Sequence, residues 1–209
     1  MVADEILKSR IKELADRDWD EDKITQRYLK LCQTGIPKKE LDFFRLKAEK
    51  TEILDRVQRR AEEYNFLAKN CPQGTALALM EEFGLGNMAL IKALGPFPGI
   101  AGTGRICGGV TGGLIALGLC FGGDDMRDFE ATGVAIQMGQ QFLAAVEQEL
   151  GYLTCAEIHE NVVFGRNMDP GAGPEKMAAF AAAKGFEKCG LVTGTATRLA
   201  AGIIIDKIE

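Results

Sequence analysis

The sequence contains no pair of cysteines spaced as CxxC, although it has six cysteines in all. This absence excludes zinc-finger pairs, c-type haem attachment and ferredoxin-type cysteine runs, because each of these sites depends on a short local spacing. The first residues are charged throughout rather than apolar, so we expect a cytoplasmic protein whose thiols form no structural disulfide framework. Any site made from these thiols must therefore be assembled by the fold.

Aromatic residues are also scarce, and the chain has no excess of basic residues. Phe, Tyr and Trp make up 7% of the chain, whereas it has 25 glycines, and this composition favours closely packed helices over a β-sandwich. The formal net charge of −5 argues against general binding to nucleic acids or membrane surfaces. The apolar run 106–123 approaches the length of a membrane span, but it is rich in glycine and ends at Asp124 and Asp125. We therefore expect a buried helix there and no membrane contact.

Apolar residues recur at helical spacing along the chain, and alternating strand patterns are missing. We predict an N-terminal helical extension over residues 1–64 and a four-cysteine helical domain over residues 65–209. The expected helices cover about residues 3–18, 20–32, 38–69, 71–83, 87–94, 106–121, 134–150, 155 onward, 174–184 and 189–208. The predicted fold class is all-α, a compact helical bundle with a glycine-rich helix buried at its centre.

The central element is the stretch 99–122, where a glycine-rich loop leads through Cys107 into an apolar segment full of small residues. Small residues at this spacing allow a helix backbone to lie close to its neighbours, although each interior glycine costs about 1 kcal/mol of helix stability. We therefore predict a buried helix that carries Cys107 at its N-terminal end.

Four of the six cysteines fall within one turn of an expected helix N-terminus: Cys71, Cys107, Cys155 and Cys189. Unpaired backbone N–H groups and the helix dipole favour the thiolate at such positions, and the thiolate is the form that binds metals or attacks disulfides. We expect Cys32 and Cys120, placed inside helices among apolar neighbours, to be inert. On spacing alone, all six are equally well explained as ordinary buried cysteines.

Four segments carry a resemblance to a known family: NCPQGTALALMEEFGL, RICGGVTGGLIALGL, YLTCAEI and KCGLVTGTATRLAAGII. They resemble the C-GCAxxG-C-C family of redox-active proteins, which is related to the non-haem module of split-Soret cytochromes. The similarity covers about residues 55–209 and includes the four family cysteines in order. The chain departs from the family pattern at Pro72 and Gly109, where the family has alanine, and neither change removes a thiol.

The resemblance implies that the four cysteines converge and hold a [2Fe–2S] or [4Fe–4S] cluster, or alternatively zinc. It also implies that Gly102, Gly104 and Gly108 approach the cofactor with their backbone N–H groups. No CxxCH is present, so we expect no haem. On this interpretation the protein transfers electrons to a partner protein and forms a homodimer. Whether it is an enzyme stays open; if it is one, it is an oxidoreductase.

Two other functions remain alternatives. In the first, the same cysteines cycle as a metal-free thiol–disulfide protein. In the second, the chain is a redox-sensing DNA-binding regulator, because residues 23–46 have helix–turn–helix spacing around Gly35 and residues 23–50 carry a net charge of +5. His159, the single histidine, lies four residues after Cys155 and hence on the same helical face. It is either a further metal ligand, a proton shuttle or an ordinary polar residue.

Overall fold

The computed structural model describes residues 2–208, with side chains from Glu5 onward, and over this range the chain is helical with no strand. The elements are α1 (Val2–Asp16), α2 (Glu21–Thr34), α3 (Phe43–Ala48), α4 (Lys50–Ala68), α5 (Cys71–Phe83), α6 (Met88–Ala93), α7 (Gly99–Gly102), α8 (Gly108–Phe121), α9 (Phe129–Leu150), α10 (Cys155–Ile158), the π-helix η1 (His159–Val163), the 3₁₀ turn η2 (Pro170–Ala172), α11 (Pro174–Ala182), α12 (Gly185–Lys188) and α13 (Gly190–Lys207). The all-α prediction is confirmed.

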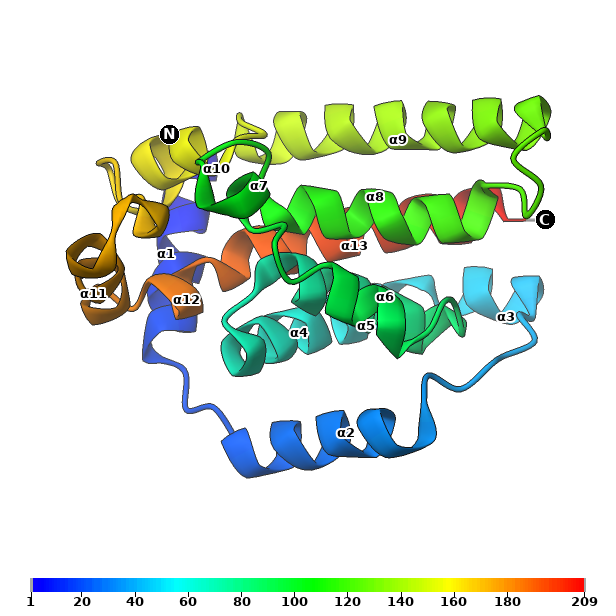
Figure 1. Ribbon diagram of the computed structural model, residues 1–209, viewed down its shortest axis with the longest axis horizontal. Helices are drawn as coiled ribbons and strands as arrows, with labels where there is room; N and C mark the ends of the chain where they lie inside the picture. The colour runs from blue at the N-terminus through cyan, green and yellow to red at the C-terminus, as the bar shows by residue number, and fades with distance from the viewer. Residues whose placement is uncertain (1, 209) are drawn as a thin grey trace.

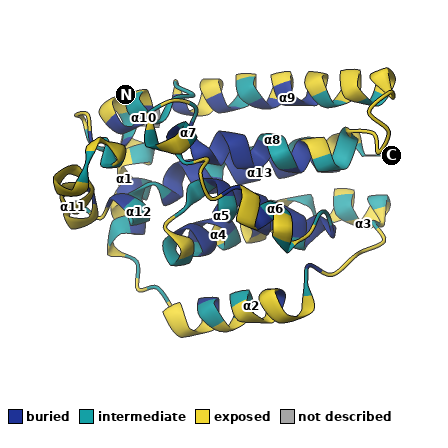
Figure 2. Ribbon diagram, viewed as in Figure 1, coloured by how far each residue is buried: buried dark blue, intermediate teal, exposed yellow. Residues whose placement is uncertain are grey.

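Helix α8 lies at the centre, with α5, α9 and α13 packed around it (Figure 1). Its glycines make this possible. A Cβ atom added to Gly112 would lie 2.6 Å from the Pro72 carbonyl oxygen of α5, and one added to Gly113 would lie 2.4 Å from the Phe142 ring of α9. Most of α8 is accordingly buried (Figure 2). The predicted buried glycine-rich helix is thus present.

Helix α9 covers one side of the bundle and turns a single stripe towards α8 (Figure 1). Met138, Phe142, Val146 and Leu150 recur every four residues and are buried, whereas the opposite face is exposed (Figure 2). The helix begins earlier than predicted because the side chain of Asp128 accepts a hydrogen bond from the Ala131 N–H and caps it.

The N-terminal helices are fastened to this core by a buried carboxylate. Glu62 of α4 is 1% exposed and pairs with Arg10 of α1 at 2.7 Å and with Arg17 at 2.8 Å. The predicted domain boundary at residue 64 falls inside α4, which packs against both α5 and α13. Three basic residues of the helix–turn–helix segment form ion pairs within the chain: Arg27 pairs with Glu63, Arg45 with Glu49 and Lys50 with Asp206.

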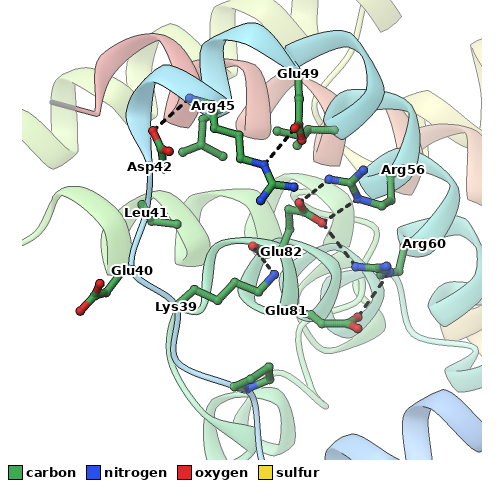
Figure 3. Close-up of a pocket in the computed structure, with 13 residues that line it drawn as sticks. Lys39, Glu40, Leu41, Asp42, Arg45, Glu49, Arg56, Arg60, Glu81 and Glu82 are labelled. Carbon is green, nitrogen blue, oxygen red and sulfur yellow. Dashed lines mark hydrogen bonds and ion pairs between the residues drawn. The ribbon is translucent and has the colours of Figure 1, made fainter.

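The prediction of one helix over residues 38–69 is wrong. Residues 35–42 form a non-helical linker, α3 begins only after Asp42, whose side chain caps it, and the helix is interrupted again at Glu49. The linker is held by tertiary contacts that local spacing does not encode, because Lys39 Nζ donates to the Glu82 carbonyl oxygen at 2.7 Å. Figure 3 shows the hollow beside the linker, about 440 Å³, where Arg56 and Arg60 both reach the Glu82 carboxylate.

Within residues 2–208, one helical stretch, 185–207, is long and apolar enough to cross a membrane by length and composition alone. Sixty-one per cent of its apolar window is buried inside the protein, and a core helix satisfies the same test. Helix α8, in the run that the sequence suggested as buried, has only 14 residues and is shorter than the roughly 20 that a span requires.

Candidate functional site

One cavity of about 70 Å³ brings together four of the six cysteines and the single histidine. Its thiol and imidazole side chains are those of Cys71, Cys107, Cys155, Cys189 and His159. The remaining wall is mainly apolar and includes Pro98, Ile158, Phe180, Phe186 and Val192. We call this space the cysteine cavity. The structure thus brings together the four cysteines that the resemblance implies would converge, at the end of the bundle where α8 and α13 begin (Figure 1).

Two of the cysteines enter the cavity from the starts of the paired core helices α5 and α8. Cys71 is the first residue of α5, which Asn70 caps by accepting a hydrogen bond from the Gln73 N–H at 3.2 Å. Cys107 is the N-cap residue of α8 and is 5% exposed. The two helix starts lie close together because Gly108 has no side chain: a Cβ there would be 2.3 Å from Cys71 Sγ.

A short antiparallel backbone pairing positions Cys107 next to Cys155. Ile106 and Thr154 form an isolated bridge. The Cys107 N–H donates to the Leu153 carbonyl at 2.9 Å, and the Cys155 N–H donates to the Arg105 carbonyl at 2.7 Å. Both thiols are thus attached to a hydrogen-bonded backbone pair. Thr154 caps α10 as predicted, since the Glu157 N–H donates to Thr154 Oγ1, but the Glu157 carboxylate accepts from the Thr154 hydroxyl, so only half of the predicted capping box is present.

Cys189 reaches the cavity from the junction of α12 and α13. Asn65 of α4 is 2% exposed and donates through Nδ2 to the Phe186 carbonyl at 2.7 Å, which fixes α12 against the core. Asn65 also lines the cavity, together with the exposed Lys69. No sequence motif marks either residue, because their role depends on α12 folding back onto α4.

The environment of α8 makes Cys107 the most acidic of the cavity thiols. The Cys71 thiol donates to the Cys107 sulfur and lowers the pKa of Cys107, although burial acts in the opposite direction. The backbone N–H groups of the first turn of α8 lower it further, without any one of them making a close capping hydrogen bond. Cys107 is therefore the thiol that ionises first.

The other three thiols are harder to ionise. Donation to Cys107 and burial raise the pKa of Cys71 well above its ordinary value. Burial, reinforced by the negative charge of nearby Cys107 and Asp169, raises the pKa of Cys155. Burial raises the pKa of Cys189 in the same way, with Cys155 and Cys107 adding to the effect. Of the four cavity thiols, Cys107 is thus the only one whose surroundings lower its pKa, and the other three have raised pKa values.

His159 begins the π-helical turn η1, is 3% exposed and packs against the rings of Phe164 and Phe180, which also contact each other. Its Nδ1 lies 2.8 Å from the Met168 carbonyl oxygen. Its Nε2 lies 3.6 Å from Cys155 Sγ and 3.4 Å from Cys189 Sγ. Helical spacing predicted that His159 shares a face with Cys155, but the contact with Cys189 comes from the tertiary fold.

The three glycines expected at the cofactor are not grouped together. Gly102 and Gly104 have positive φ angles and lie in the loop before Cys107, but neither lines the cysteine cavity; Pro98 of the same loop does. The Gly108 N–H, by contrast, is one of the groups that lower the pKa of Cys107. The loop is conformationally strained, because Ile100 also has a positive φ of 52°.

Residues 69–203 match the model of a family described as "Putative redox-active protein (C_GCAxxG_C_C)". The chain belongs to this family. The matched region holds the whole four-cysteine set and begins at the end of α4, so α1, α2 and α3 lie outside it. No curated protein and no solved structure matches the chain. Membership in this redox-active family agrees with a cavity whose donors are mainly thiols.

The two remaining cysteines do not line the cavity. Cys120 is half-buried near the end of α8, and burial raises its pKa to about 11. Cys32 was expected among apolar neighbours, and this prediction is wrong: it lies on an outward face of α2 and is exposed. Both are therefore matched controls for the cavity thiols.

The donor set suits a thiophilic metal, since thiolates select zinc, copper(I) and iron–sulfur clusters. Among the residues with described side chains, however, no group of three or more His, Cys, Asp or Glu is already placed to hold a metal ion. The chemistry of the residues therefore fits such a group, and binding one requires the side chains that line the cavity to turn towards a common point.

Proposed function

We propose that the cysteine cavity is the redox centre of the protein and binds an iron–sulfur cluster, or another thiophilic metal ion, through its cysteines Cys71, Cys107, Cys155 and Cys189. In this proposal the bound group exchanges single electrons with a partner protein in the cytoplasm. The observation that carries the proposal is that four thiols from four separate helix starts line one small apolar cavity. Ordinary buried cysteines have no reason to gather in this way.

The residues around the thiols suit this role. Cys107 already favours the thiolate, which is the form that binds a metal, and the cavity is otherwise lined by apolar side chains that exclude water. When bound, an iron–sulfur cluster would supply reversible one-electron chemistry. The chain supplies the thiolate ligands, the N–H groups that stabilise negative charge, and a dry surrounding.

The position of the cavity also supports electron exchange. Pro98 and Pro170 line the cavity and are half-buried, and Lys69 beside it is exposed. The thiols therefore lie only one layer of side chains below the surface. A partner docked against the segments around Pro98 and Pro170 would approach the centre without unfolding any helix.

The test is purification without air, followed by a visible absorption spectrum and iron and sulfide analysis. We expect iron with sulfide in the wild-type protein and in the Cys32→Ser and Cys120→Ser controls, and its loss in Cys107→Ser. Each control also removes one thiol, so a difference between the two groups is specific to the cavity. A wild-type protein that stays colourless and metal-free after anaerobic reconstitution with iron and sulfide contradicts the proposal.

A metal-free thiol–disulfide function is the second candidate, favoured by the Cys71–Cys107 contact. The Cys107 thiolate would attack a partner disulfide, forming a mixed disulfide and releasing one partner thiolate. Cys71 would then lose its proton and attack the Cys107 sulfur, releasing the second partner thiolate. Two thiols of the chain become one disulfide, and the partner disulfide gains two electrons. This candidate ranks second because Cys107 is only 5% exposed.

Counting free thiols separates the two candidates. In the metal-free protein, oxidation by a small disulfide should remove two thiols, and the Cys71→Ser variant should lose this change while Cys32→Ser keeps it. A thiol count that oxidation leaves unchanged in the wild-type protein removes the thiol–disulfide function.

A further inference from the structure

His159 is held in one tautomer by its backbone partner. A carbonyl oxygen can only accept a hydrogen bond, so the 2.8 Å contact with Met168 requires the proton to lie on Nδ1. In the neutral ring, Nε2 then carries a lone pair and no proton. This is the arrangement in which metal-binding histidines are usually fixed, with one nitrogen tied to a carbonyl and the other free to coordinate.

The lone pair of Nε2 faces two sulfur atoms of the cysteine cavity. In a tetrahedral site with metal–sulfur bonds of about 2.3 Å and metal–nitrogen bonds of about 2.0–2.1 Å, neighbouring nitrogen and sulfur atoms lie about 3.6 Å apart. The observed distances are 3.6 Å to Cys155 Sγ and 3.4 Å to Cys189 Sγ. The same lengths serve as S–H···N hydrogen bonds while no metal is bound. To hold a metal ion, the cysteine side chains still have to turn towards a common point, while His159 Nε2 already faces them.

The cavity also holds one donor more than a four-position centre needs. Four thiolates add four negative charges to a space lined mainly by apolar side chains, whereas a neutral imidazole adds none. His159 itself is rigidly placed: it is 3% exposed, and its ring contacts Phe164 and Phe180. Little ordering entropy remains to be lost when it binds.

From this geometry we infer that His159 Nε2 is a terminal ligand of the metal centre, in place of one of the two cysteines that face it. The centre then has three cysteines and one histidine, and either Cys155 or Cys189 keeps its thiol. The inference rests on the proposed metal-binding function. Cys71 and Cys107 are ligands in every version of it, because His159 makes contact with neither.

The test uses the fact that His159 is the only histidine, so ¹⁵N-histidine labelling reports on this ring alone. The full-length, reduced protein is titrated without air with Cd²⁺ enriched in ¹¹³Cd and followed by ¹⁵N NMR. We expect the Nε2 resonance to shift and to split by coupling to the metal, while the protonated Nδ1 resonance stays coupled to its hydrogen. Ultraviolet cadmium–thiolate absorption measures metal binding independently.

The two proposals fail in different ways. Cadmium–thiolate absorption with an unchanged Nε2 resonance overturns the ligand role of His159 and leaves the four-cysteine centre standing. Absence of cadmium–thiolate absorption, together with no iron uptake, overturns the proposed function and this inference with it.

A variant pair adds a second measurement on the iron-loaded protein. The side-chain amide of His159→Asn keeps a donor for the Met168 carbonyl but removes the nitrogen that faces the sulfurs, whereas His159→Ala removes both. We expect both variants to fold, as checked by circular dichroism, and both to show the same shifted visible spectrum and altered reduction potential. A spectrum and potential that change only in His159→Ala would assign His159 a packing role and contradict ligation.

Discussion

The cysteine cavity has two sides that use the same residue type in different electrostatic surroundings. On the α8 side, Cys107 receives donation from Cys71 and from the first-turn N–H groups, and its pKa is lowered. On the opposite side, Cys155 and Cys189 are paired only with the neutral His159 ring, and burial raises the pKa of both. A helix start therefore does not by itself make a thiolate; the number of donors aimed at the sulfur decides.

The largest expected difference between the two sides is in metal binding. Cys107→Ser should reduce the affinity for Cd²⁺ by at least about 100-fold, the upper end of the loss seen when an outer-shell partner is removed. Cys155→Ser and Cys189→Ser should lose less, because His159 and the other cysteine remain on that side. Competition with a chelator measures the affinities, and Cys32→Ser is the control. Equal losses in all three variants would remove the distinction between the sides.

The close packing of the start of α8 against the start of α5 should be disrupted by adding one methyl group at Gly108. In Gly108→Ala the new Cβ would lie 2.3 Å from both Cys71 Sγ and Pro72 Cδ, so the start of α5 must move. We expect a loss of about 1–3 kcal/mol in the free energy of unfolding, as for other overpacked cores, and a weaker Cys71–Cys107 contact. Urea unfolding and the thiol count after oxidation measure the two effects.

The matched control lies in the same helix. Gly118 has no atom within 4 Å of an added Cβ, so Gly118→Ala should instead raise the free energy of unfolding by up to about 1 kcal/mol through helix propensity. If both variants lose stability to the same extent, the close approach of α5 to α8 is not the cause.

The raised pKa values predict how the stability of the reduced, metal-free protein depends on pH. A thiol with a higher pKa in the folded state keeps its proton while the unfolded chain loses it, so the free energy of unfolding falls as pH rises above about 8.5, the ordinary value for cysteine. Each such thiol contributes up to about 1.4 kcal/mol per pH unit. Cys107, with its lowered pKa, acts in the opposite direction.

Urea unfolding between neutral and alkaline pH tests this dependence. The measurement is best made in a Cys120→Ala background, because the raised pKa of Cys120 adds a slope unrelated to the cavity. Adding Cys189→Ala should then make the decrease shallower, since it removes one raised thiol. A decrease that is equally steep with and without Cys189 contradicts the assignment.

Local signals in the sequence account for the places where three of the four cysteines begin their helices. The capping box at Thr154, the proline after Cys71 and the glycines after Cys107 are all read within a few residues, and each acts through a backbone geometry that is itself local. The resemblance supplied the expectation that these starts form one site. The glycines of α8 also signalled close packing, although not which helix each would meet.

Other features of the fold and the site could not be predicted from the sequence, because they depend on contacts between segments that are distant along the chain. The contact of His159 with Cys189 requires the π-helical turn after Ile158 and the packing of Phe180 on the histidine ring. The linker between α2 and α3 is held by the contact of Lys39 with the Glu82 carbonyl oxygen, which joins the linker to α5. Cys32 occupies a helix interior in sequence, and only the placement of α2 decides that it faces solvent.

The smallest expected effect concerns one carboxylate beside the His159 side of the cavity. The negative charge of Asp169 contributes to the raised pKa of Cys155 but is not among the main influences on the pKa of Cys107. In Asp169→Asn the pKa of Cys155 should therefore fall slightly, while that of Cys107 stays unchanged. The variant keeps an oxygen that can accept the Gly171 N–H, which Asp169 now accepts at 2.9 Å, so the turn η2 is preserved.

Alkylation of the reduced, metal-free protein over a range of pH, read out for each cysteine by mass spectrometry, measures both pKa values in one sample. A lower pKa at Cys155 alone would show that the charge of Asp169 acts on the His159 side of the cavity and not on Cys107. An equal change in the pKa of Cys107 would mean that the charge near η2 affects thiols on both sides of the cavity. The difference in pKa between the sides would then come only from the hydrogen-bond donors at the start of α8.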